Sequence, residues 1–217
     1  MQRLRGRARI VARLGVSLAA ASCGGDSNDG AGCGPFTPCG GDPTGVWQAQ
    51  SVCSEIAVED VLAAQGLPPE CGDALRITEV RQVGTLSLGA GSYDENVDFT
   101  IVWDLRFDLT CVNALAEAPV PAAQIPAFCD GFQEQIRSDP ESPFTDMTCR
   151  VAGDACLCDA LQNELVASVG TLQIGGNNLL FEAGDDRQFC ASGDELVLET
   201  ADPMIGLFQV TYARAMR

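Results

Sequence analysis

The residue types that carry most enzyme chemistry are missing from this chain. Its 217 residues include no histidine and no lysine, which excludes Ser-His and Cys-His pairs, Ser-Lys dyads and Schiff-base chemistry. Carboxylates remain, among them the adjacent pairs Asp94-Glu95, Asp185-Asp186 and Asp194-Glu195. These pairs lie near Gly-rich turns, where charged side chains are usually solvated. The sequence therefore favours a protein that is not an enzyme and has no cofactor or metal, with a carboxylate-based hydrolase as the remote alternative.

Cysteine is the reactive residue that this chain holds in excess. It has 11 cysteines, and a single residue separates Cys156 from Cys158. A disulfide between these two would close a very small ring. A metal or redox role would need partner residues and reducing conditions, and the sequence indicates neither. We therefore expect each of the two to bond a different cysteine.

The first cysteine, Cys23, ends a leader sequence. Residues 1–22 contain five arginines and no acid, followed by a short apolar stretch and small residues, which is the pattern of a secretory signal peptide. The apolar part is too short to span a bilayer, which takes about 20 apolar residues. The six residues LAAASC that end at Cys23 resemble the lipobox of bacterial lipoproteins. The alternative is plain cleavage at an Ala-x-Ala site.

The lipobox resemblance implies that Cys23 is acylated and becomes the mature N-terminus. Gly24 follows it, where an aspartate would retain a lipoprotein at the inner membrane, so the expected location is the outer membrane. A lipid on Cys23 would anchor the protein without a transmembrane helix. Residues 23–44, rich in Gly, Asp, Ser, Asn and Pro, are expected to form a flexible tether whose far end Cys33 and Cys39 tie down.

Assigning Cys23 to the lipid leaves ten cysteines, an even number that suits an oxidised exported domain with up to five disulfides. The disulfide candidates are Cys33, Cys39, Cys53, Cys71, Cys111, Cys129, Cys149, Cys156, Cys158 and Cys190. Spacing alone does not fix their connectivity. One local set would be Cys33–Cys39, Cys53–Cys71, Cys111–Cys129, Cys149–Cys156 and Cys158–Cys190.

The charge of the chain limits its partners. The whole chain carries −17, and removal of the five leader arginines brings the remainder to −22. Such a surface repels phosphates and anionic headgroups, so we expect no nucleic acid partner and contact with the membrane only through the lipid. The apolar fraction of 46% is that of a folded protein, and residues 45–217 are long enough for one domain with a sizeable core.

The clearest periodic signal lies in residues 97–111. Apolar residues or cysteine occupy every second position from Val97 to Cys111, and the positions between are polar except at Val102. This pattern predicts a strand buried on one face. At about 3.3 Å per residue it would run roughly 50 Å, so we expect it to bend or break, as strands do when a sheet curls into a barrel.

Shorter β signals surround this strand. Residues 45–53 and 207–213 predict the first and last strands, and residues 83–89 recur in similar form as residues 169–175. Because the flanking cysteines do not repeat, the recurrence predicts two similar hairpins rather than a duplicated domain. Residues 157–169 are ambiguous between helix and strand.

Two segments show helical spacing instead. Residues 54–66 begin with Ser54, a good N-cap, and residues 112–137 hold a helical insertion with Pro126 in the first turn of its helix. The apolar face of that helix comprises Ile125, Phe128, Cys129, Phe132 and Ile136. Its Cys129 suits a buried disulfide to the strand that ends at Cys111.

Several of these residues resemble a known fold. Gly45-Val46-Trp47 at the first strand and Arg214 near the end of the last are similar to lipocalin-like barrels, in which the tryptophan closes one end and a late arginine packs on it. This resemblance implies a mainly β fold with short helices, an antiparallel lipocalin-like β-barrel stapled by disulfides. Trp47 and Arg214 are its barrel-closing candidates. The insertion at 112–137 departs from a simple up-and-down barrel.

A closer resemblance involves the cysteine motifs. Residues 39–47 (CGGDPTGVW), Cys156-Leu157-Cys158, Gly170-Thr171 and residues 190–196 look like elements of uncharacterised cysteine-rich lipoproteins of myxobacterial type with a lipocalin-like domain. The resemblance spans most of residues 39–217 and implies a fold but no activity.

Two functional hypotheses follow from the sequence. In the first, a lipid-anchored envelope lipoprotein binds a small apolar ligand inside the barrel. In the second, side chains fill the barrel, and the protein has a structural or interaction role in which its acidic loops meet another envelope protein. An open interior of a few hundred Å³ would favour the first, and a packed interior the second.

Overall fold

The computed structural model describes residues 33–55, 67–116, 119–140, 142–182, 184–202 and 206–215. The leader, Cys23 and the first part of the expected tether lie outside these residues, and so does most of the helix expected at 54–66. Ser54, its expected N-cap, lies instead in the first strand, which continues to Glu55.

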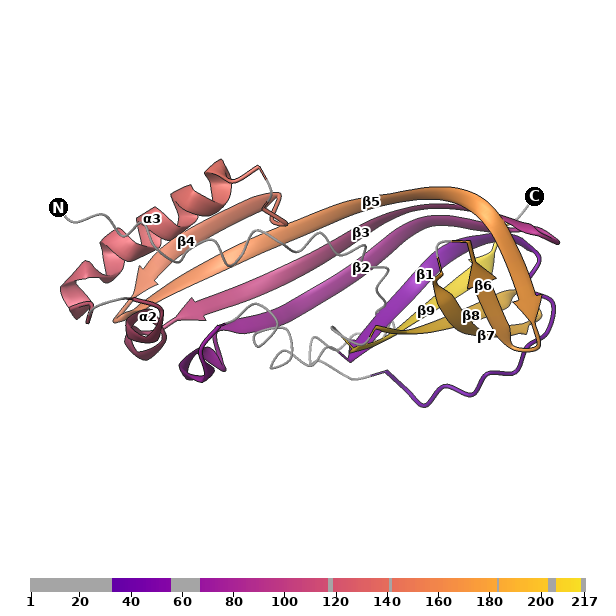
Figure 1. The fold of residues 1–217 in the computed structure, drawn as a ribbon, viewed down its shortest axis with the longest axis horizontal. Coiled ribbons are helices and arrows are strands. Elements are labelled where there is room, and N and C mark those ends of the chain that lie inside the picture. The colour runs from indigo at the N-terminus through magenta and orange to yellow at the C-terminus, as the bar shows by residue number, and fades with distance from the viewer. Residues whose placement is uncertain are drawn as a thin grey trace. The chain divides into compact units, whose positions relative to one another are not determined.

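The described residues form a mainly antiparallel β-sheet with short helices, which confirms the coarse fold prediction (Figure 1). The strands are β1 (Gly45–Glu55), β2 (Leu75–Leu88), β3 (Ser92–Phe107), β4 (Asp146–Ala152), β5 (Ala155–Gly175), β6 (Asn178–Phe181), β7 (Asp186–Ser192), β8 (Glu195–Asp202) and β9 (Gly206–Arg214). The helices are α2 (Leu109–Leu115) and α3 (Ile125–Ser138), with single 3-10 turns η2 (Pro69–Cys71) and η3 (Ala122–Gln124).

The strands follow the order β3-β2-β1-β9-β8-β7-β6-β5-β4, and β3 also pairs with β5. Strands β5 to β9 therefore lie beside their neighbours in sequence. The antiparallel pairing of β1 with β9 joins the first strand to the last, with Trp47 opposite Arg214 and an irregularity between Ala49 and Ser51. The ambiguous residues 157–169 belong to β5.

The described chain falls into two compact units. We call residues 33–55, 80–100 and 164–215 the β-unit, and residues 67–79 and 101–163 the helical unit. Strands β2, β3 and β5 contribute residues to both.

Buried and exposed side chains alternate along the strands of the β-unit. In its part of β3, Tyr93, Glu95, Val97 and Phe99 are buried and alternate with exposed or half-buried residues. The two similar segments each lead into a tight hairpin, as predicted. The first hairpin closes with a hydrogen bond from the Gly89 N–H to the Ser92 carbonyl, and the second pairs Gly175 with Asn178.

Each of these repeats contains a glycine with a close neighbour. A Cβ on Gly84, whose φ is 129°, would collide with the backbone of Asn96 and Val97. A Cβ on Gly170 would lie 2.9 Å from Cε1 of Tyr93. The shared Gly-Thr sequence therefore reflects close approach in both places, to backbone in one and to an aromatic ring in the other.

The predicted strand at 97–111 is displaced in the structure. Strand β3 begins earlier, at Ser92, and ends at Phe107. Asp108 then caps helix α2, because its side chain accepts a hydrogen bond of 2.9 Å from the Cys111 N–H. This cap satisfies an N–H that the first turn of the helix would otherwise leave unpaired. The prediction that Cys111 ends a strand was wrong, since its alternation is the start of a helix.

The insertion predicted at 112–137 corresponds to α2, η3 and α3. Helix α3 begins at Ile125 with Pro126 in its first turn, as expected, and buries Ile125, Cys129 and Ile136. The rings of Phe128 and Phe132 pack on Phe107, with centroids at 6.0 and 4.8 Å. These contacts hold the apolar face of the helix against the end of β3.

All ten cysteines of the described residues form disulfides. The pairs are Cys33–Cys53, Cys39–Cys190, Cys71–Cys111, Cys129–Cys156 and Cys149–Cys158. None of the five local pairs suggested by spacing is present, including the disulfide expected between Cys111 and Cys129. Cys156 and Cys158 do bond different partners, as predicted.

Strand pairing accounts for two of the five disulfides, which separation in sequence did not predict. Cys149 lies directly opposite Cys158 in the β4–β5 hairpin. Gly40, next to Cys39, forms an isolated bridge with Cys190. Sheet partners bring side chains within disulfide distance regardless of how far apart they are in the chain.

Candidate functional site

The residue to which the sequence assigns a lipid, Cys23, lies outside the described residues. Among the residues that the structure describes, no helix is both long and apolar enough to cross a membrane.

Trp47 and Arg214 lie in contact. They occupy opposite positions on β1 and β9, and the guanidinium carbon of Arg214 lies 4.3 Å from the centre of the Trp47 ring. The Trp47 indole N–H donates to the Pro43 carbonyl at 2.7 Å, and Nη1 of Arg214 donates to the Thr44 carbonyl at 3.0 Å. Both polar groups therefore bind the segment that precedes β1, while the guanidinium lies over the indole ring in a cation–π contact.

Gly45 allows this arrangement. Its φ is 143°, and a Cβ there would lie 2.5 Å from Nη1 of Arg214. A side chain at this position would displace the guanidinium from the indole. The Gly-x-Trp sequence and the late arginine are thus parts of one contact.

Asp42 folds the segment before β1. Its Oδ1 accepts hydrogen bonds from the Thr44 hydroxyl at 2.6 Å and from the Thr44 N–H at 3.0 Å. The hydroxyl bond first, and then the N–H bond, hold the pKa of Asp42 below its ordinary value. This carboxylate is fully exposed, so it also adds negative charge to the surface.

A second group of polar residues lies in the interior of the β-unit. We call Glu95, Arg187, Asp185, Tyr212 and Gln82 the buried polar cluster. Nη1 and Nη2 of Arg187 donate to the two carboxylate oxygens of Glu95 at 2.9 and 3.1 Å. The Nε of Arg187 donates to Asp185 at 2.6 Å. The side chains of Glu95 and Arg187 are only 2% and 7% exposed, so this is a bidentate ion pair out of water.

Strand alternation places both charges inside. Glu95 shares the buried face of β3 with Tyr93 and Val97, and Arg187 shares that of β7 with Phe189. The guanidinium of Arg187 lies over the Phe181 ring at 4.5 Å. Aromatic packing therefore holds the cation where the carboxylate reaches it.

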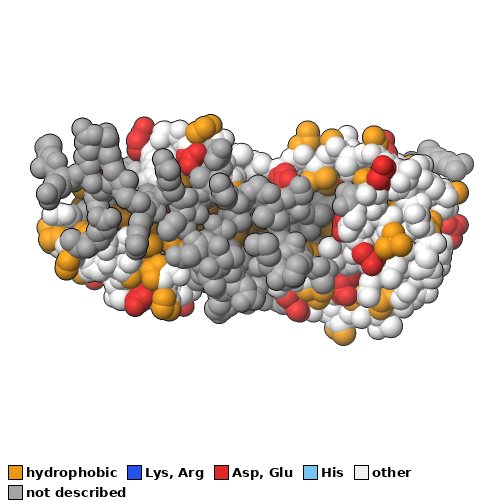
Figure 2. All heavy atoms as spheres, viewed as in Figure 1, with side chains coloured by type: hydrophobic (Ala, Val, Ile, Leu, Met, Phe, Trp, Pro, Cys, Tyr) orange, Lys and Arg blue, Asp and Glu red, His pale blue; other side chains and the backbone are white. Residues whose placement is uncertain are grey.

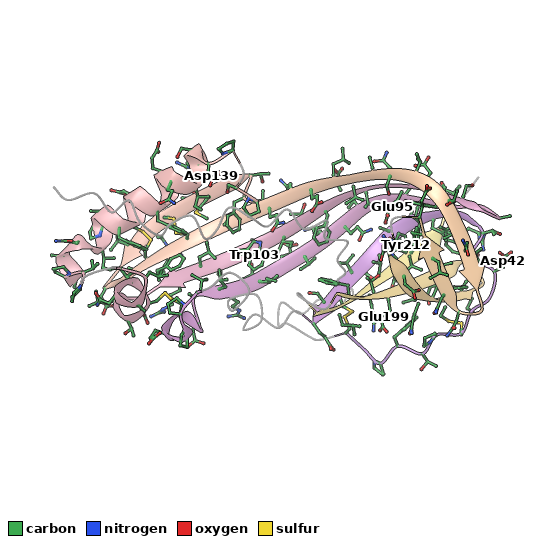
Figure 3. The ribbon with its side chains drawn as sticks, in the orientation of Figure 1. Asp42, Glu95, Trp103, Asp139, Glu199 and Tyr212 are labelled. Carbon is green, nitrogen blue, oxygen red and sulfur yellow. A yellow bond between two sulfur atoms is a disulfide. The ribbon has the colours of Figure 1, made fainter. Side chains whose placement is uncertain are left out.

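Tyr212 and Gln82 extend the cluster. Gln82 Nε2 donates to the Tyr212 hydroxyl at 3.0 Å, and Gln82 Oε1 has no hydrogen-bond partner among the described residues. Burial, and then the charge of Glu95, raise the pKa of Tyr212 well above its ordinary value. Burial alone would lower the pKa of Arg187, but Glu95 and then Asp185 outweigh it and raise this pKa, so the arginine stays charged. Figure 3 labels Glu95 and Tyr212.

The expectation that all paired acids are solvated was wrong for Glu95. Asp94, Asp186, Asp194 and Glu195 are exposed, but Glu95 is buried and Asp185 is half-buried beside Arg187. Extending the alternation of residues 97–111 by one step toward the N-terminus would have placed Glu95 on the apolar face. The sequence carried no signal that Arg187 is its partner, because the two are 92 residues apart.

The carboxylate of the Glu95–Arg187 pair is fully occupied. Both oxygens of Glu95 accept hydrogen bonds from Arg187, and the guanidinium stacks on a ring. A general acid or nucleophile must have an oxygen free to reach substrate. This arrangement suits a structural ion pair.

No family model, curated protein or solved structure matches this chain.

Proposed function

We propose that this protein is an outer-membrane lipoprotein, anchored by a lipid on Cys23, whose lipocalin-like barrel is filled by its own side chains. Its role is structural or is the binding of another envelope protein, rather than transport of a small apolar ligand. The resemblance to cysteine-rich lipoproteins of myxobacterial type is part of this proposal.

The pairing of the strands supports a lipocalin-like barrel. When the β3–β5 pairing is included and β4 is set aside, β1, β2, β3 and β5 to β9 each have two neighbours and follow one another in sequence order. This is the connectivity of an up-and-down barrel of eight strands. Strand β4 and the helices are then an insertion between β3 and β5. The stacking of Arg214 on Trp47 fits the barrel-closing roles that the resemblance gives them.

Burial of large side chains in the β-unit is the observation that carries the filled interior. Trp47, Leu86, Phe189, Leu196 and Tyr212 each expose 0% of their surface. The wall of an open ligand chamber keeps surface that water can reach, whereas these side chains have none. The Glu95–Arg187 pair also occupies the interior, and an apolar ligand would gain little beside it.

Surface charge indicates the kind of partner. Exposed acids lie at loops and strand ends of the β-unit, including Asp42, Asp186, Asp194 and Glu195. Acidic side chains are also spread over the face drawn in Figure 2. A basic surface on another envelope protein is the complementary partner, and salt should weaken its binding.

Native mass spectrometry of protein purified from its host tests the filled barrel. We expect the mass of the acylated chain without a small molecule, and no saturable binding of an apolar fluorescent probe. A co-purified small molecule in stoichiometric amount would show that the interior opens to a ligand and would contradict the proposal.

The anchor has a separate test. Replacement Cys23→Ala should remove the acyl mass and release the protein from the membrane fraction. Ser22→Ala keeps the cysteine and is the matched control, so it should remain membrane-bound. A native N-terminus upstream of an unmodified Cys23 would refute acylation.

A further inference from the structure

Part of strand β5 has an edge that no strand of the described chain covers. Strand β4 pairs with β5 as far as Leu161, and β6, which has only four residues, pairs with it from Leu172 onward. The last backbone hydrogen bonds on this side of β5 end at the carbonyls of Leu161 and Thr171. We call residues 165–169, which lie between these two carbonyls, the open edge.

The regular pleat of β5 decides which backbone groups face this edge. Successive strand residues direct their N–H and C=O groups to opposite edges and their side chains to opposite faces. Burial alternates without a break from Leu161 to Thr171, so no bulge interrupts the pattern. Leu165, Ala167 and Val169 fall at the same alternate positions as these two residues. Their N–H and C=O groups therefore face the uncovered side, and their side chains are exposed.

The open edge lacks the features that usually protect an edge strand. Exposed edges in soluble proteins commonly carry a charged side chain, a proline or a bulge, which prevents pairing with another chain. Residues 165–181 contain no charged residue and no proline, and they are the longest uncharged stretch of a chain that carries −17. Leu165 is 64% exposed and Val169 is 74% exposed. Exposed apolar side chains beside unpaired backbone groups suit an edge that binds another strand.

The outward side chains around the open edge read alike in both directions. In chain order they are polar, apolar, small, apolar and polar: Asn163, Leu165, Ala167, Val169 and Thr171. If two copies paired in antiparallel fashion about Ala167, Leu165 of each copy would lie opposite Val169 of the other, and the two alanines would meet at the twofold axis. Each of these opposite pairs would exchange two N–H···O hydrogen bonds.

We propose that the open edge of β5 binds the same edge of a second copy of this chain, in an antiparallel, twofold-symmetric seam centred on Ala167. Charge favours this occupant, because the open edge offers two acidic chains an uncharged place to meet and offers a basic partner no acid. The seam is shorter than the interfaces of stable dimers, so the association is reversible. This interface goes beyond the proposed function and depends on neither the lipid nor the filled interior.

Cysteine cross-linking in membranes of the host tests the position of the axis. Ala167→Cys places a thiol where the Cα atoms of a hydrogen-bonded antiparallel pair lie about 5.5 Å apart, which is within disulfide distance. Mild oxidation should give a dimer that reductant returns to monomer. Gln173→Cys is the matched control, since Gln173 is exposed on the same face of β5 but β6 covers its edge with Leu180 opposite. Its yield of dimer should be at least about 10-fold lower.

Sedimentation equilibrium of the detergent-solubilised full chain measures the strength of the seam. Val169→Glu places two carboxylates in the seam and should raise the Kd of the dimer at least about 10-fold. Val83→Glu adds the same charge at a position that is 58% exposed on β2, a strand with a neighbour on each side, and should change the Kd less than about twofold. Added salt should tighten the wild-type dimer, because it screens the repulsion between two acidic chains.

The outcomes separate this interface from the proposed function. Cross-linking tests the seam even if Val169→Glu folds poorly. A chain that stays monomeric at the highest attainable concentration, equal cross-linking of the two cysteine variants, or an unchanged Kd in folded Val169→Glu would each overturn the proposal. A dimer that salt weakens would also contradict it, because a seam of uncharged residues predicts the opposite. None of these results alters the expectations for the filled barrel or for Cys23→Ala, which have their own measurements.

Discussion

The β-unit and the helical unit use the same two kinds of interaction in different settings. The β-unit holds a carboxylate–guanidinium pair, Glu95–Arg187, that is almost fully buried, whereas the Arg150–Asp159 pair of the helical unit is 60% and 57% exposed. The longest disulfide loop of the β-unit spans 151 residues, and the shortest of the helical unit spans 9. The contribution of each ion pair to the free energy of unfolding should therefore depend on its burial, and that of each disulfide on the length of the loop it closes.

Loss of the long disulfide should have the largest effect. By loop-closure entropy, Cys39→Ser with Cys190→Ser should lower the free energy of unfolding by about 5 kcal/mol, and Cys149→Ser with Cys158→Ser by about 2.5 kcal/mol. Urea unfolding without reductant measures both. Equal losses in the two variants would mean that loop length does not determine how much each disulfide stabilises the fold.

Breaking the buried ion pair should come next. Glu95→Ala leaves the charge of Arg187 buried without its main partner and should cost about 3–5 kcal/mol. The matched control Arg150→Ala should cost at most about 1 kcal/mol, because its pair is solvated. The double replacement Glu95→Leu with Arg187→Met should recover most of the loss. A small effect of Glu95→Ala in urea unfolding would contradict the burial of the pair.

Alkaline pH should separate the wild-type chain from a Tyr212→Phe variant. The folded state keeps Tyr212 protonated, because its pKa is raised from an ordinary value of 10.0, whereas the unfolded chain loses this proton near that value. The free energy of unfolding therefore keeps the full contribution of Tyr212 below about pH 10. Above that pH it should fall by about 1.4 kcal/mol per pH unit. Urea unfolding between about pH 9 and 11 should show this slope for wild type, with the contribution of Tyr212 absent from the variant. Parallel slopes would refute the assignment.

The smallest effect is expected at the start of α2. Asp108→Ala removes the side-chain cap of the Cys111 N–H and should cost about 1 kcal/mol. Asp104→Ala, at an exposed position of β3, is the control and should change stability by less than about 0.5 kcal/mol. If both cost the same in urea unfolding, the cap does not stabilise the helix.

The sequence predicted those features that depend on local patterns. Alternation revealed β3, and apolar spacing with Pro126 located α3. The two Gly-Thr repeats correctly indicated two hairpins. Each of these signals arises within about 15 residues of chain, over which burial imposes a fixed period.

Features that depend on distant partners could not be predicted in this way. The disulfide of Cys39 with Cys190 and the pairing of Glu95 with Arg187 join residues that are far apart in the chain, and β3 and β7, which carry Glu95 and Arg187, are not neighbouring strands. The predicted end of β3 was wrong for a different reason. Leu109 and Cys111 continue the alternation by coincidence, while the single side chain of Asp108 switches the backbone to helix.

The disulfides at Cys33 and Cys39 determine how a load on the proposed lipid anchor would reach the fold. The expected tether of residues 23–44 is shortened, because Cys33 is bonded to Cys53 of β1. Nine residues then lie between Cys23 and Cys33, which makes a leash of at most about 36 Å. Cys39 attaches the same segment to Cys190 of β7. Tension on the leash would thus be divided between two strands instead of peeling β1 from its end.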